Sequence, residues 1–369
     1  MSVFLIAFGI SLILTLLIVH HAHLHGHITN DHDLDGVQKF HATPVPRVGG
    51  IPLAGGAVAV LLYLSLFETP EQFRFFALLC LCALPAFLSG LLEDLTKRVG
   101  VSIRLGFTML AAVVAFFLLD GRLTRLDIPG LDALLAWTPL AVLVTAIAVG
   151  GIANAINIVD GFNGLASAAS MIMLLALAYI GYKVGDVLVV QCSLVMVGAL
   201  LGFFLWNWPW GLIFLGDGGA YLVGFWIAEL SVLLVARNPE VSPWFPLMVV
   251  AYPLVETLFS VYRRTVIKKT SPGLPDAAHL HQIIFKRLVR WAVGSEEARH
   301  LKIRNSMTSP YLWVISSFCV IPAVLLWQWT LWLQFCFVGF VVFYIVLYQR
   351  LVRFKAPKWL VLRWPVDLP

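Results

Sequence analysis

Three short acidic motifs combine residue types that can bind a divalent cation and phosphate. Residues 154–164 read NAINIVDGFNG, and the other two motifs are LLEDLTKR at 91–98 and FLGDGGA at 214–220. Carboxylates and carboxamides are hard oxygen ligands, which suit Mg²⁺ or Mn²⁺ and do not suit zinc. Glycines around Asp160 and Asp217 allow the backbone to come close to a ligand. We therefore expect a hard cation held by few protein oxygens, with positions left for phosphate.

Two further segments carry basic side chains that can neutralise phosphate. They are DLDGVQKFHATPVPRVGG at 33–50 and PDAAHLHQIIFKR at 275–287. Their candidate residues are Lys39, His41, Arg47, His279, His281 and Arg287. Two histidines at positions i and i+2 do not share a helix face, so phosphate binding is favoured over a metal pair in the second segment.

The histidine-rich run HHAHLHGH at 20–27 is a separate feature. It offers a metal site or marks the membrane interface, and the second interpretation is favoured. Each acidic motif taken alone is equally compatible with a solvated helix cap. Three of them at one membrane boundary, beside basic loops, favour a reactive site, because ionisable groups at membrane depth are costly and usually functional.

The chain that positions these residues is too apolar for a soluble protein. Of its 369 residues, 60% are hydrophobic and 12% are charged, and apolar runs recur at about the 20 residues that a helix needs to cross a bilayer. Barrel strands are not expected, because alternation with period two is absent. We predict an all-α fold, a polytopic membrane helix bundle with about eleven transmembrane helices. The predicted spans are residues 2–19, 49–67, 74–92, 103–119, 138–154, 164–182, 187–205, 218–236, 243–262, 310–327 and 329–349.

The distribution of basic residues predicts the orientation of the bundle. Most of the 25 Lys and Arg residues fall in the loops and the tail on one side of the predicted spans. That side is expected to be cytoplasmic, which puts the N-terminus outside, the C-terminus in the cytoplasm and the acidic motifs at the cytoplasmic boundary. The net charge of +5 then follows from membrane topology and requires no nucleic-acid partner.

Residues 1–369 are predicted to form a single integral membrane domain. The largest cytoplasmic loop, 263–309, carries apolar residues at helical spacing among basic ones, which predicts an amphipathic helix on the membrane surface. The first apolar run lacks a basic leader and a cleavage site, so we interpret it as a retained helix. The five cysteines fall in predicted spans and are expected to be packing residues.

In their order along the chain, the motifs resemble those of the polyprenyl-phosphate N-acetylhexosamine-1-phosphate transferases, in glycosyltransferase family 4. This group includes bacterial enzymes of the UDP-GlcNAc:undecaprenyl-phosphate type that start O-antigen and teichoic acid synthesis. The resemblance covers residues 33 to about 290. Its most specific piece is NAINIVDGFNGLA, followed by the pattern K-x-H-x-x-P-x-P-R-x-G-G and by FLGDGG.

The resemblance implies transfer of N-acetylhexosamine-1-phosphate from a UDP-sugar to undecaprenyl or another polyprenyl phosphate, with release of UMP, at the bacterial inner membrane. Such a step initiates O-antigen or another cell-envelope polysaccharide. The resemblance also implies Mg²⁺, or Mn²⁺ in its place, at Asp217 and Asn157, and catalytic roles for Asp94, Glu93 and Asp160. Substrate-binding positions are Lys39, His41, Arg47, Asn154, Asn163, His279, His281 and Arg287.

Three positions depart from the pattern of this family. Glu93 replaces the first residue of the usual Asp-Asp pair, so Asp94 is the stronger catalytic candidate. Gln282 stands where relatives often carry another His, and Ala220 stands where Ser is common. These differences concern the sugar and phosphate contacts more than the class of reaction.

The expected mechanism is direct attack of the lipid phosphate on the sugar-bound phosphorus. The second pKa of a phosphate monoester is about 6, so the acceptor is mostly dianionic near neutral pH and a strong base is not required. A divalent cation and basic side chains would neutralise charge in the transition state. A covalent aspartyl-phosphate step is the alternative.

Other functions stay open at this point. A polytopic transporter would carry polar residues near the bilayer midplane and repeat symmetry. The phospho-muramyl-pentapeptide translocase of peptidoglycan synthesis is another alternative, disfavoured by HLHQ at 279–282. A phosphoalcohol transferase with CDP-linked donors is disfavoured because its signature is missing around Asp160. The identity of the sugar, the polysaccharide pathway and the formation of a homodimer are undecided.

Overall fold

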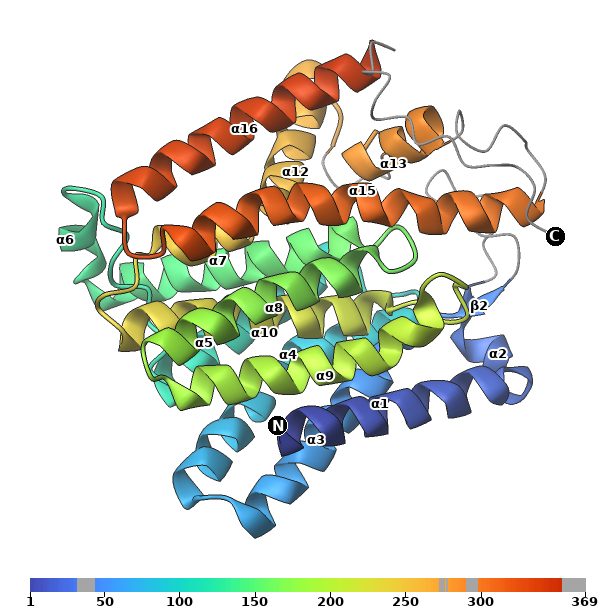
Figure 1. The fold of residues 1–369 in the computed structure, drawn as a ribbon, viewed down its shortest axis with the longest axis horizontal. Coiled ribbons are helices and arrows are strands. Elements are labelled where there is room, and N and C mark those ends of the chain that lie inside the picture. Colours follow the sequence, from blue (N-terminus) through green and yellow to red (C-terminus); the bar gives the residue numbers. More distant parts are fainter. Residues whose placement is uncertain (32–43, 272–275, 277, 290–297, 354–369) are drawn as a thin grey trace.

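The computed structural model describes residues 1–31, 44–271, 276, 278–289 and 298–353 (Figure 1). Most of these residues are helical, which confirms the predicted all-α fold. The strands among them form one antiparallel pair, β1 (Asn30–Asp31) and β2 (Val45–Pro46).

Ten of the described helices are long and apolar enough to span a membrane. They are α1 (Ser2–His20), α3 (Gly50–Phe67), α4 (Pro70–Thr96), α5 (Val101–Leu118), α7 (Thr138–Val159), α8 (Leu165–Lys183), α9 (Val187–Asn207), α10 (Gly216–Arg237), α15 (Ala298–Leu325) and α16 (Thr330–Val352). The described chain is therefore that of a multi-pass membrane protein.

The predicted span 243–262 is not one continuous helix. It consists of α11 (Trp244–Val249) and α12 (Ala251–Tyr262), and α12 continues into the π-helix η1 (Arg263–Ile267). Proline lacks an N–H group and its ring clashes with the carbonyl four residues earlier, so Pro253 interrupts the helix at Val249. Ten continuous spans and one broken segment thus stand, in the part of the chain described, where about eleven spans were predicted.

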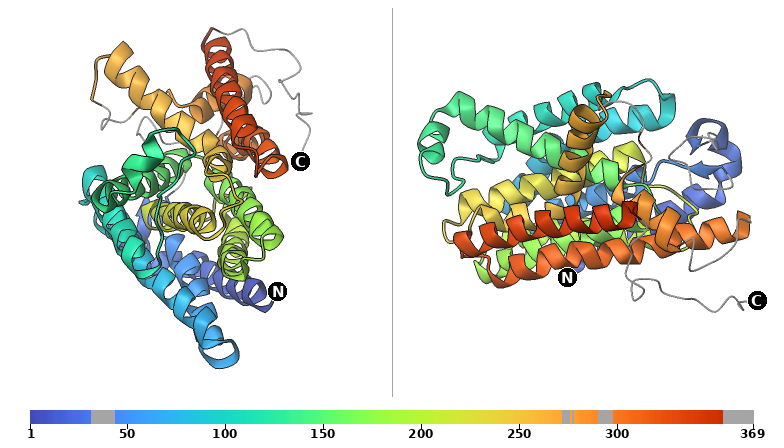
Figure 2. Two further views of the ribbon diagram at one scale, coloured as in Figure 1. Left: turned by 90° about the vertical axis from the view of Figure 1, so that its left-hand side faces the viewer. Right: turned by 90° about the horizontal axis from the view of Figure 1, so that it is seen from above.

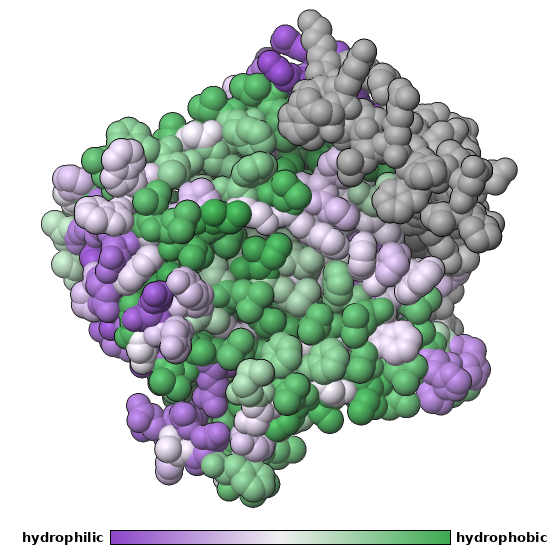
Figure 3. Space-filling view, in the orientation of Figure 1, coloured by the Kyte–Doolittle hydropathy of each residue, from purple (hydrophilic) through white to green (hydrophobic). Residues whose placement is uncertain are grey.

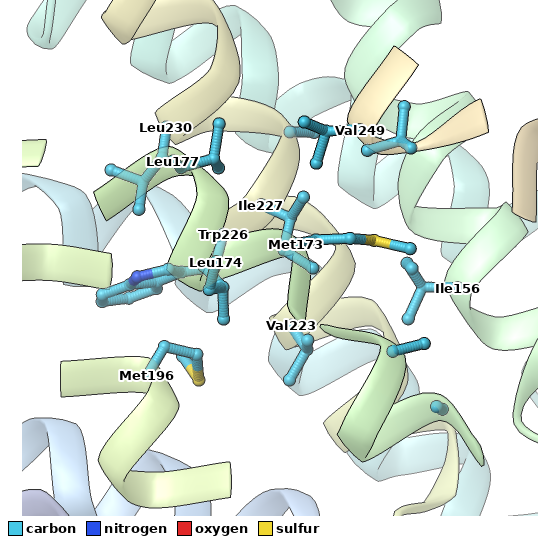
Figure 4. Packing of buried hydrophobic residues seen from close by; sticks show 14 of the residues in the cluster. Ile156, Met173, Leu174, Leu177, Met196, Val223, Trp226, Ile227, Leu230 and Val249 are labelled. Atoms are coloured by element: carbon cyan, nitrogen blue, oxygen red, sulfur yellow. The ribbon is translucent and has the colours of Figure 1, made fainter. Parts of the chain in front are cut away.

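Helix α10 lies at the centre of the bundle, as a view along the helices shows (Figure 2). Nearly all of its residues are buried, and it contacts α4, α7, α8 and α9. Its large apolar side chains pack against those of neighbouring helices (Figure 4). The labelled residues of this core include Ile156, Met173, Leu174, Leu177, Met196, Val223, Trp226, Ile227 and Leu230. In a bilayer such contacts stabilise the bundle by close van der Waals packing, because lipid is as apolar as the side chains.

The face of the bundle in Figure 3 carries a broad apolar area with polar residues near its ends. Exposed apolar side chains include Leu5 on α1 and Trp332, Phe335 and Val342 on α16. Lipid acyl chains can cover a surface of this kind, because covering its apolar side chains takes no polar group out of water.

All three acidic motifs lie at one end of the bundle, which we name the site end. Helices α4, α7 and α9 end there, and α5, α8 and α10 begin there. Helices α1 and α16 both run toward the site end, so Ser2 and Val352 lie at opposite ends of the bundle (Figure 1). The assignment of the site end to the cytoplasm stays a prediction.

The segment predicted as an amphipathic surface helix contains two short helices, α13 (Leu280–Ile284) and η2 (Phe285–Val289). The apolar residues Leu280, Ile283 and Leu288 are buried. Both short helices contact α15, and α13 also contacts α16. In this part of the loop the apolar face packs on protein, because α15 and α16 offer it a surface that the sequence alone does not reveal.

Candidate active site

Two carboxylates from distant parts of the chain meet at the site end. Asp94 lies in the last turn of α4, and Asp217 lies in the first turn of α10. The Asp94 carboxylate accepts hydrogen bonds from the backbone N–H groups of Asp217 (2.9 Å) and Gly218 (2.8 Å). The first N–H groups of a helix have no partner within it, so Asp94 caps α10 and fixes the position of Asp217.

Glycines allow the helices to approach closely enough for this contact. A Cβ atom on Gly90 would lie 2.5 Å from the carbonyl oxygen of Asp217. A Cβ atom on Gly50 would lie 2.5 Å from the amide nitrogen of Gly219. A larger residue at either place would push α4 or α3 away from α10. The glycines that follow Asp217 are closely packed as well: a Cβ atom on Gly218 would lie 3.0 Å from the amide nitrogen of Leu91, and one on Gly219 would lie 3.1 Å from that of Gly50.

The segment that follows β2 brings Arg47 to these carboxylates. The N–H of Phe214 donates to the carbonyl of Pro46 (2.8 Å), and the N–H of Gly49 donates to the carbonyl of Phe214 (3.0 Å). The Arg47 guanidinium then lies 3.4 Å from a carboxylate oxygen of Asp94 and 3.5 Å from one of Asp217. The first loop and the FLGDGGA motif thus form one wall of the site.

Arg104, in the first turn of α5, is a second cation at this place. It is buried and forms an ion pair with the Asp217 carboxylate. Its guanidinium also lies 5.5 Å from the centre of the Tyr221 ring, within reach of a cation–π contact. A desolvated carboxylate requires such partners, because an unpaired buried charge is costly. Arginine also binds phosphate through the same planar donors.

The end of α7 contributes two asparagine side chains. The Asn157 side-chain amide donates to the Asp217 carboxylate at 2.6 Å. One turn earlier, Asn154 accepts a hydrogen bond from the Tyr221 hydroxyl at 3.1 Å, which ties α7 to α10. Asp160 follows α7 as its C-cap. Asn154 therefore joins two helices, whereas Asn157 belongs to the site.

A cavity of about 350 Å³ opens beside these residues. Its lining includes Arg47, Arg104, Asn157, Asp160, Asn163, Asp217, His279 and His281. Burial, together with repulsion from the Asp217 carboxylate, raises the pKa of Asp160 to about 7. We name this space the active-site cavity, since it joins oxygen ligands and cations in the way that a metal-bridged phosphate requires.

The turn between α7 and α8 forms another wall, and residues from α9 and α15 hold it. The Asn163 N–H donates to the side-chain oxygen of Asn305 (2.8 Å), and its carbonyl accepts from the Ser309 hydroxyl (2.6 Å). The Gly164 N–H donates to the side-chain oxygen of Asn207 (2.6 Å). Gly164 has φ +74°, a conformation that favours glycine. The beginning of α15 therefore fixes Asn163 in the cavity wall.

His279 and His281 lie together at the cavity. Their rings stack with centroids 5.3 Å apart. The expectation that helical spacing separates them is wrong, because His279 precedes α13 as its N-cap and has extended backbone angles. Nδ1 of His279 lies 2.9 Å from the buried carboxylate of Glu256, which also accepts from the Tyr344 hydroxyl (2.8 Å). Glu256 thus orients His279 toward the site.

His281 is an uncharged imidazole near neutral pH. Burial and the neighbouring His279 lower its pKa to about 3, against an opposing effect of Glu256. Its Nδ1 is buried and has no hydrogen-bond partner among the described residues. An uncharged imidazole can exchange hydrogen bonds with a ligand, but it adds no positive charge to the cavity that it lines.

Some candidate residues lie away from the cavity or outside the described structure. Glu93 accepts a hydrogen bond from the N–H of Val99 at 2.6 Å and does not line the cavity. Arg287 donates to backbone carbonyls at the end of α16, one of them at 2.6 Å. Lys39 and His41 lie outside the described residues.

Several residues of the site escaped the sequence analysis. They are Arg104, Asn207, Glu256, Asn305 and Ser309. Arg104 and Glu256 carried a signal, since each is an ionisable residue inside a predicted span. Asn305 carried none, because its contact with Asn163 joins positions 142 residues apart.

Comparison with known proteins agrees with the motifs. Residues 76–235 match the family model described as glycosyl transferase family 4. The chain is 26% identical over 85% of its length, and 81% of the relative, to "Probable undecaprenyl-phosphate N-acetylglucosaminyl 1-phosphate transferase" of Bacillus subtilis (strain 168). It is 28% identical over 69% of its length, and 72% of the relative, to "Undecaprenyl-phosphate alpha-N-acetylglucosaminyl 1-phosphate transferase" of Thermotoga maritima.

A third relative is "Decaprenyl-phosphate N-acetylglucosaminephosphotransferase" of Mycobacterium tuberculosis, 27% identical over 75% of this chain and 71% of the relative. These matches confirm the resemblance that the motifs indicated. The chain is therefore a membrane-embedded transferase, and over residues 76–235 it is similar to glycosyl transferase family 4.

Proposed function

We propose that this protein transfers N-acetylhexosamine-1-phosphate from a UDP-sugar to undecaprenyl phosphate or another polyprenyl phosphate. The acceptor phosphate forms a bond to the sugar-bound phosphorus, the bond to UMP breaks, and a diphosphate-linked lipid results. One observation carries the proposal: Asp94 and Asp217 meet, with Arg47 and Arg104, beside a cavity at the end of a membrane bundle. The names of the relatives support the class of acceptor.

The position of the cavity suits one lipid-borne and one water-borne substrate. The polyprenyl chain stays in the bilayer, whereas the nucleotide arrives from water, so both can meet only at the membrane boundary. Holding them together there removes much of the entropic cost of a bimolecular encounter. We propose that the site end faces the cytoplasm of a bacterium, across the inner membrane, because most basic loops lie on that side.

A divalent cation, Mg²⁺ or Mn²⁺, fits the donor set of the cavity. In the described part of the chain, no three His, Cys, Asp or Glu side chains form a complete metal-binding group. Mg²⁺ commonly uses only one or two carboxylates and takes its other ligands from water and substrate phosphates. Asp217 and Asn157 would hold the ion, with Asp160 beside them. A bound ion would neutralise phosphate charge.

The other side chains of the site each have a separate role in the proposed reaction. Arg47 and Arg104 bind and orient the phosphates that approach Asp217, and they reduce repulsion between the two anionic substrates. Asn163 and His281 offer hydrogen bonds from the cavity wall to the donor. Asp94 has both carboxylate oxygens engaged by backbone N–H groups and is buried, which supports direct attack by the lipid phosphate over a covalent step at Asp94.

The competing functions fit the arrangement less well. A transporter would place its polar groups near the midplane, whereas Asp94, Asp160 and Asp217 all lie at helix ends. N-acetylglucosamine is the first donor to test, because the relatives are named for it. Initiation of O-antigen synthesis is the pathway we propose for the product, with the muramyl-pentapeptide donor as the comparison.

The proposal is tested by supplying purified protein with undecaprenyl phosphate, Mg²⁺ and a panel of UDP-sugars while UMP release is measured. The panel contains UDP-GlcNAc, UDP-GalNAc, UDP-QuiNAc, UDP-FucNAc and UDP-MurNAc-pentapeptide. We expect UMP release with at least one N-acetylhexosamine donor, and no release when lipid phosphate or Mg²⁺ is omitted. Protein that stays folded and binds Mg²⁺ but releases no UMP from any donor rules the proposal out.

Asn305→Ala should raise the KM for the UDP-sugar about tenfold, with a smaller change in the KM for the lipid phosphate. The substitution leaves the buried N–H of Asn163 without an acceptor, which costs about 1–3 kcal/mol and loosens the donor side of the cavity. Asn305→Asp keeps an oxygen at that place and should restore most of the affinity. Steady-state kinetics with each substrate varied in turn measures both constants.

A matched control for this prediction is Ser316→Ala on the same helix. Its hydroxyl donates to the carbonyl of Leu312 within α15 and touches no part of the cavity, so both KM values should stay unchanged. An Asn305→Ala variant with wild-type KM for the donor, or with equal rises for both substrates, contradicts the positioning role.

Acidification from pH 6.5 to pH 5 should destabilise the protein by about 1.5 kcal/mol through His281 alone. The unfolded chain binds a proton at this histidine near pH 6.5, but the folded protein does not bind it until the pH approaches its folded pKa of about 3. Stability therefore falls as the pH falls through that window. Melting temperatures in detergent between pH 7 and pH 5 measure the effect.

His281→Gln should flatten this pH dependence. His23→Gln is the control, because that imidazole is exposed and folding moves it into no apolar site. The role of His281 is refuted by an equal loss of melting temperature on acidification in wild type and His281→Gln.

A further inference from the structure

A second and larger cavity lies beside the active site, between α12 and α16. Its volume is about 1050 Å³, against about 350 Å³ for the active-site cavity. Residues of α12, η1, α13, η2 and α16 line it. No residue that lines it also lines the active-site cavity. We name it the α12–α16 groove.

The part of the groove formed by the spans is apolar. Leu258 and Phe259 line it from α12, and Val341 and Ile345 line it from α16. Leu258 is 57% exposed, so the groove is open to the membrane on this side. Walls of this composition match hydrocarbon chains, which lose no hydrogen bonds when they enter.

The other part of the groove is strongly cationic. Its charged lining residues are Arg263, Lys268, Lys286, Arg287 and Arg353, and none of the described residues that line it carries a carboxylate. Asp276 lies nearby and pairs with Arg263 and Lys268. The lining thus gathers several cations, Lys268 and Arg353 among them, at a place where an anion can pair with them.

The charges and the apolar walls lie at different depths. Lys268 directly follows η1, and Arg353 directly follows α16, both at the site end. Val341 precedes Arg353 by twelve helical positions, which corresponds to about 18 Å along the axis. The groove is thus cationic at the membrane boundary and apolar inside the bilayer, as a lipid with an anionic head group requires. Basic pockets between membrane helices commonly bind such head groups.

A polar wall separates the groove from the reacting groups. Glu256 binds His279 and Tyr344, and the Arg263 guanidinium donates to the carbonyl of Ala278 (2.6 Å) and to the Tyr348 hydroxyl (2.7 Å). These contacts join α12, α13 and α16 between the two cavities. A phosphate held by Lys268 and Arg353 would therefore lie outside the active-site cavity.

We propose that the α12–α16 groove binds an anionic phospholipid of the bilayer as a structural ligand, separate from the lipid substrate. The head-group phosphate pairs with the cations at the site end, and the acyl chains fill the space between α12 and α16. This lipid braces the broken ninth segment against α16. The proposal does not depend on the transferase function, because it concerns binding at a different place.

The test uses the full chain in a neutral detergent and measures binding of phosphatidylglycerol by native mass spectrometry, with phosphatidylcholine as the uncharged-lipid comparison. We expect phosphatidylglycerol to bind in preference and to raise the melting temperature. Lys268→Gln/Arg353→Gln should weaken this binding on the order of tenfold, since each basic residue near the membrane surface contributes appreciably to anionic-lipid affinity. Arg122→Gln/Lys183→Gln, which removes two cations at the opposite end, should leave it unchanged.

A second variant keeps the charges and fills the groove. Leu258→Trp should also weaken phosphatidylglycerol binding, while UMP release with undecaprenyl phosphate stays near wild type in all these variants. Equal binding of both phospholipids to the wild type, or full binding to Lys268→Gln/Arg353→Gln, overturns the proposal. Displacement of phosphatidylglycerol by undecaprenyl phosphate, with a raised KM for that substrate in the same variants, also overturns it by assigning the groove to the acceptor.

Discussion

Asp217→Asn should lower kcat by about 10²- to 10⁴-fold while the bundle stays folded. The substitution removes the negative charge that Arg47 and Arg104 share, and under the proposed function it removes the charged ligand of the cation. The Asn side chain keeps nearly the same size, so the packing of α10 against α4 is preserved. UMP release under saturating substrates measures kcat, and helical circular dichroism measures folding.

A matched control for Asp217 lies at the opposite end of the bundle. Asp120 is exposed and pairs with Arg122, and its positive φ of 58° is one that Asn adopts readily. Asp120→Asn should therefore keep wild-type kcat. Near-normal turnover in Asp217→Asn would remove Asp217 from the site and would leave the proposed metal position without its principal ligand.

Asp94→Asn should lower kcat by about 10²-fold, and its neighbour Glu93→Gln by much less. Asp94 accepts one hydrogen bond at each carboxylate oxygen, from Asp217 and Gly218. An amide places an N–H group against one of these N–H donors, which costs about 1–3 kcal/mol and displaces the first turn of α10. That turn carries Asp217, so kcat falls because Asp217 is moved from its position in the site.

The comparison of the two adjacent carboxylates separates position from charge. Glu93 accepts a single hydrogen bond, from the N–H of Val99, and Gln keeps an oxygen that can accept it. Both variants remove one negative charge from the end of α4. Equal losses of kcat in the two variants would show that charge alone matters and would reject the capping role of Asp94. Binding of Mg²⁺ by each variant is a second measurement, expected to weaken only in Asp94→Asn.

The sequence predicted many of the residues that form the candidate site, but it did not predict the contacts between them. Asp217, Asp160 and Asn157 stood out because three acidic motifs meet at one predicted membrane boundary, and ionisable groups at membrane depth are costly. Arg104 was passed over, although it is charged and lies within a predicted span. Its partner Asp217 is 113 residues away, and nothing local to either residue indicates that pairing. Glu256 was missed for the same reason, since its partner His279 belongs to another segment.

The fold, like the site, could be predicted from the sequence only in part. Hydropathy and length alone determined an all-α membrane bundle, the positions of ten of its spans and the gathering of the acidic motifs at one end, because these follow from the cost of placing polar groups in lipid. Only the tertiary structure decided that Asp94 caps α10, that His279 stacks on His281 and that α15 holds Asn163. Those contacts join residues far apart in sequence, and they form when small residues such as Gly50 and Gly90 let whole helices pack closely, which no local pattern encodes.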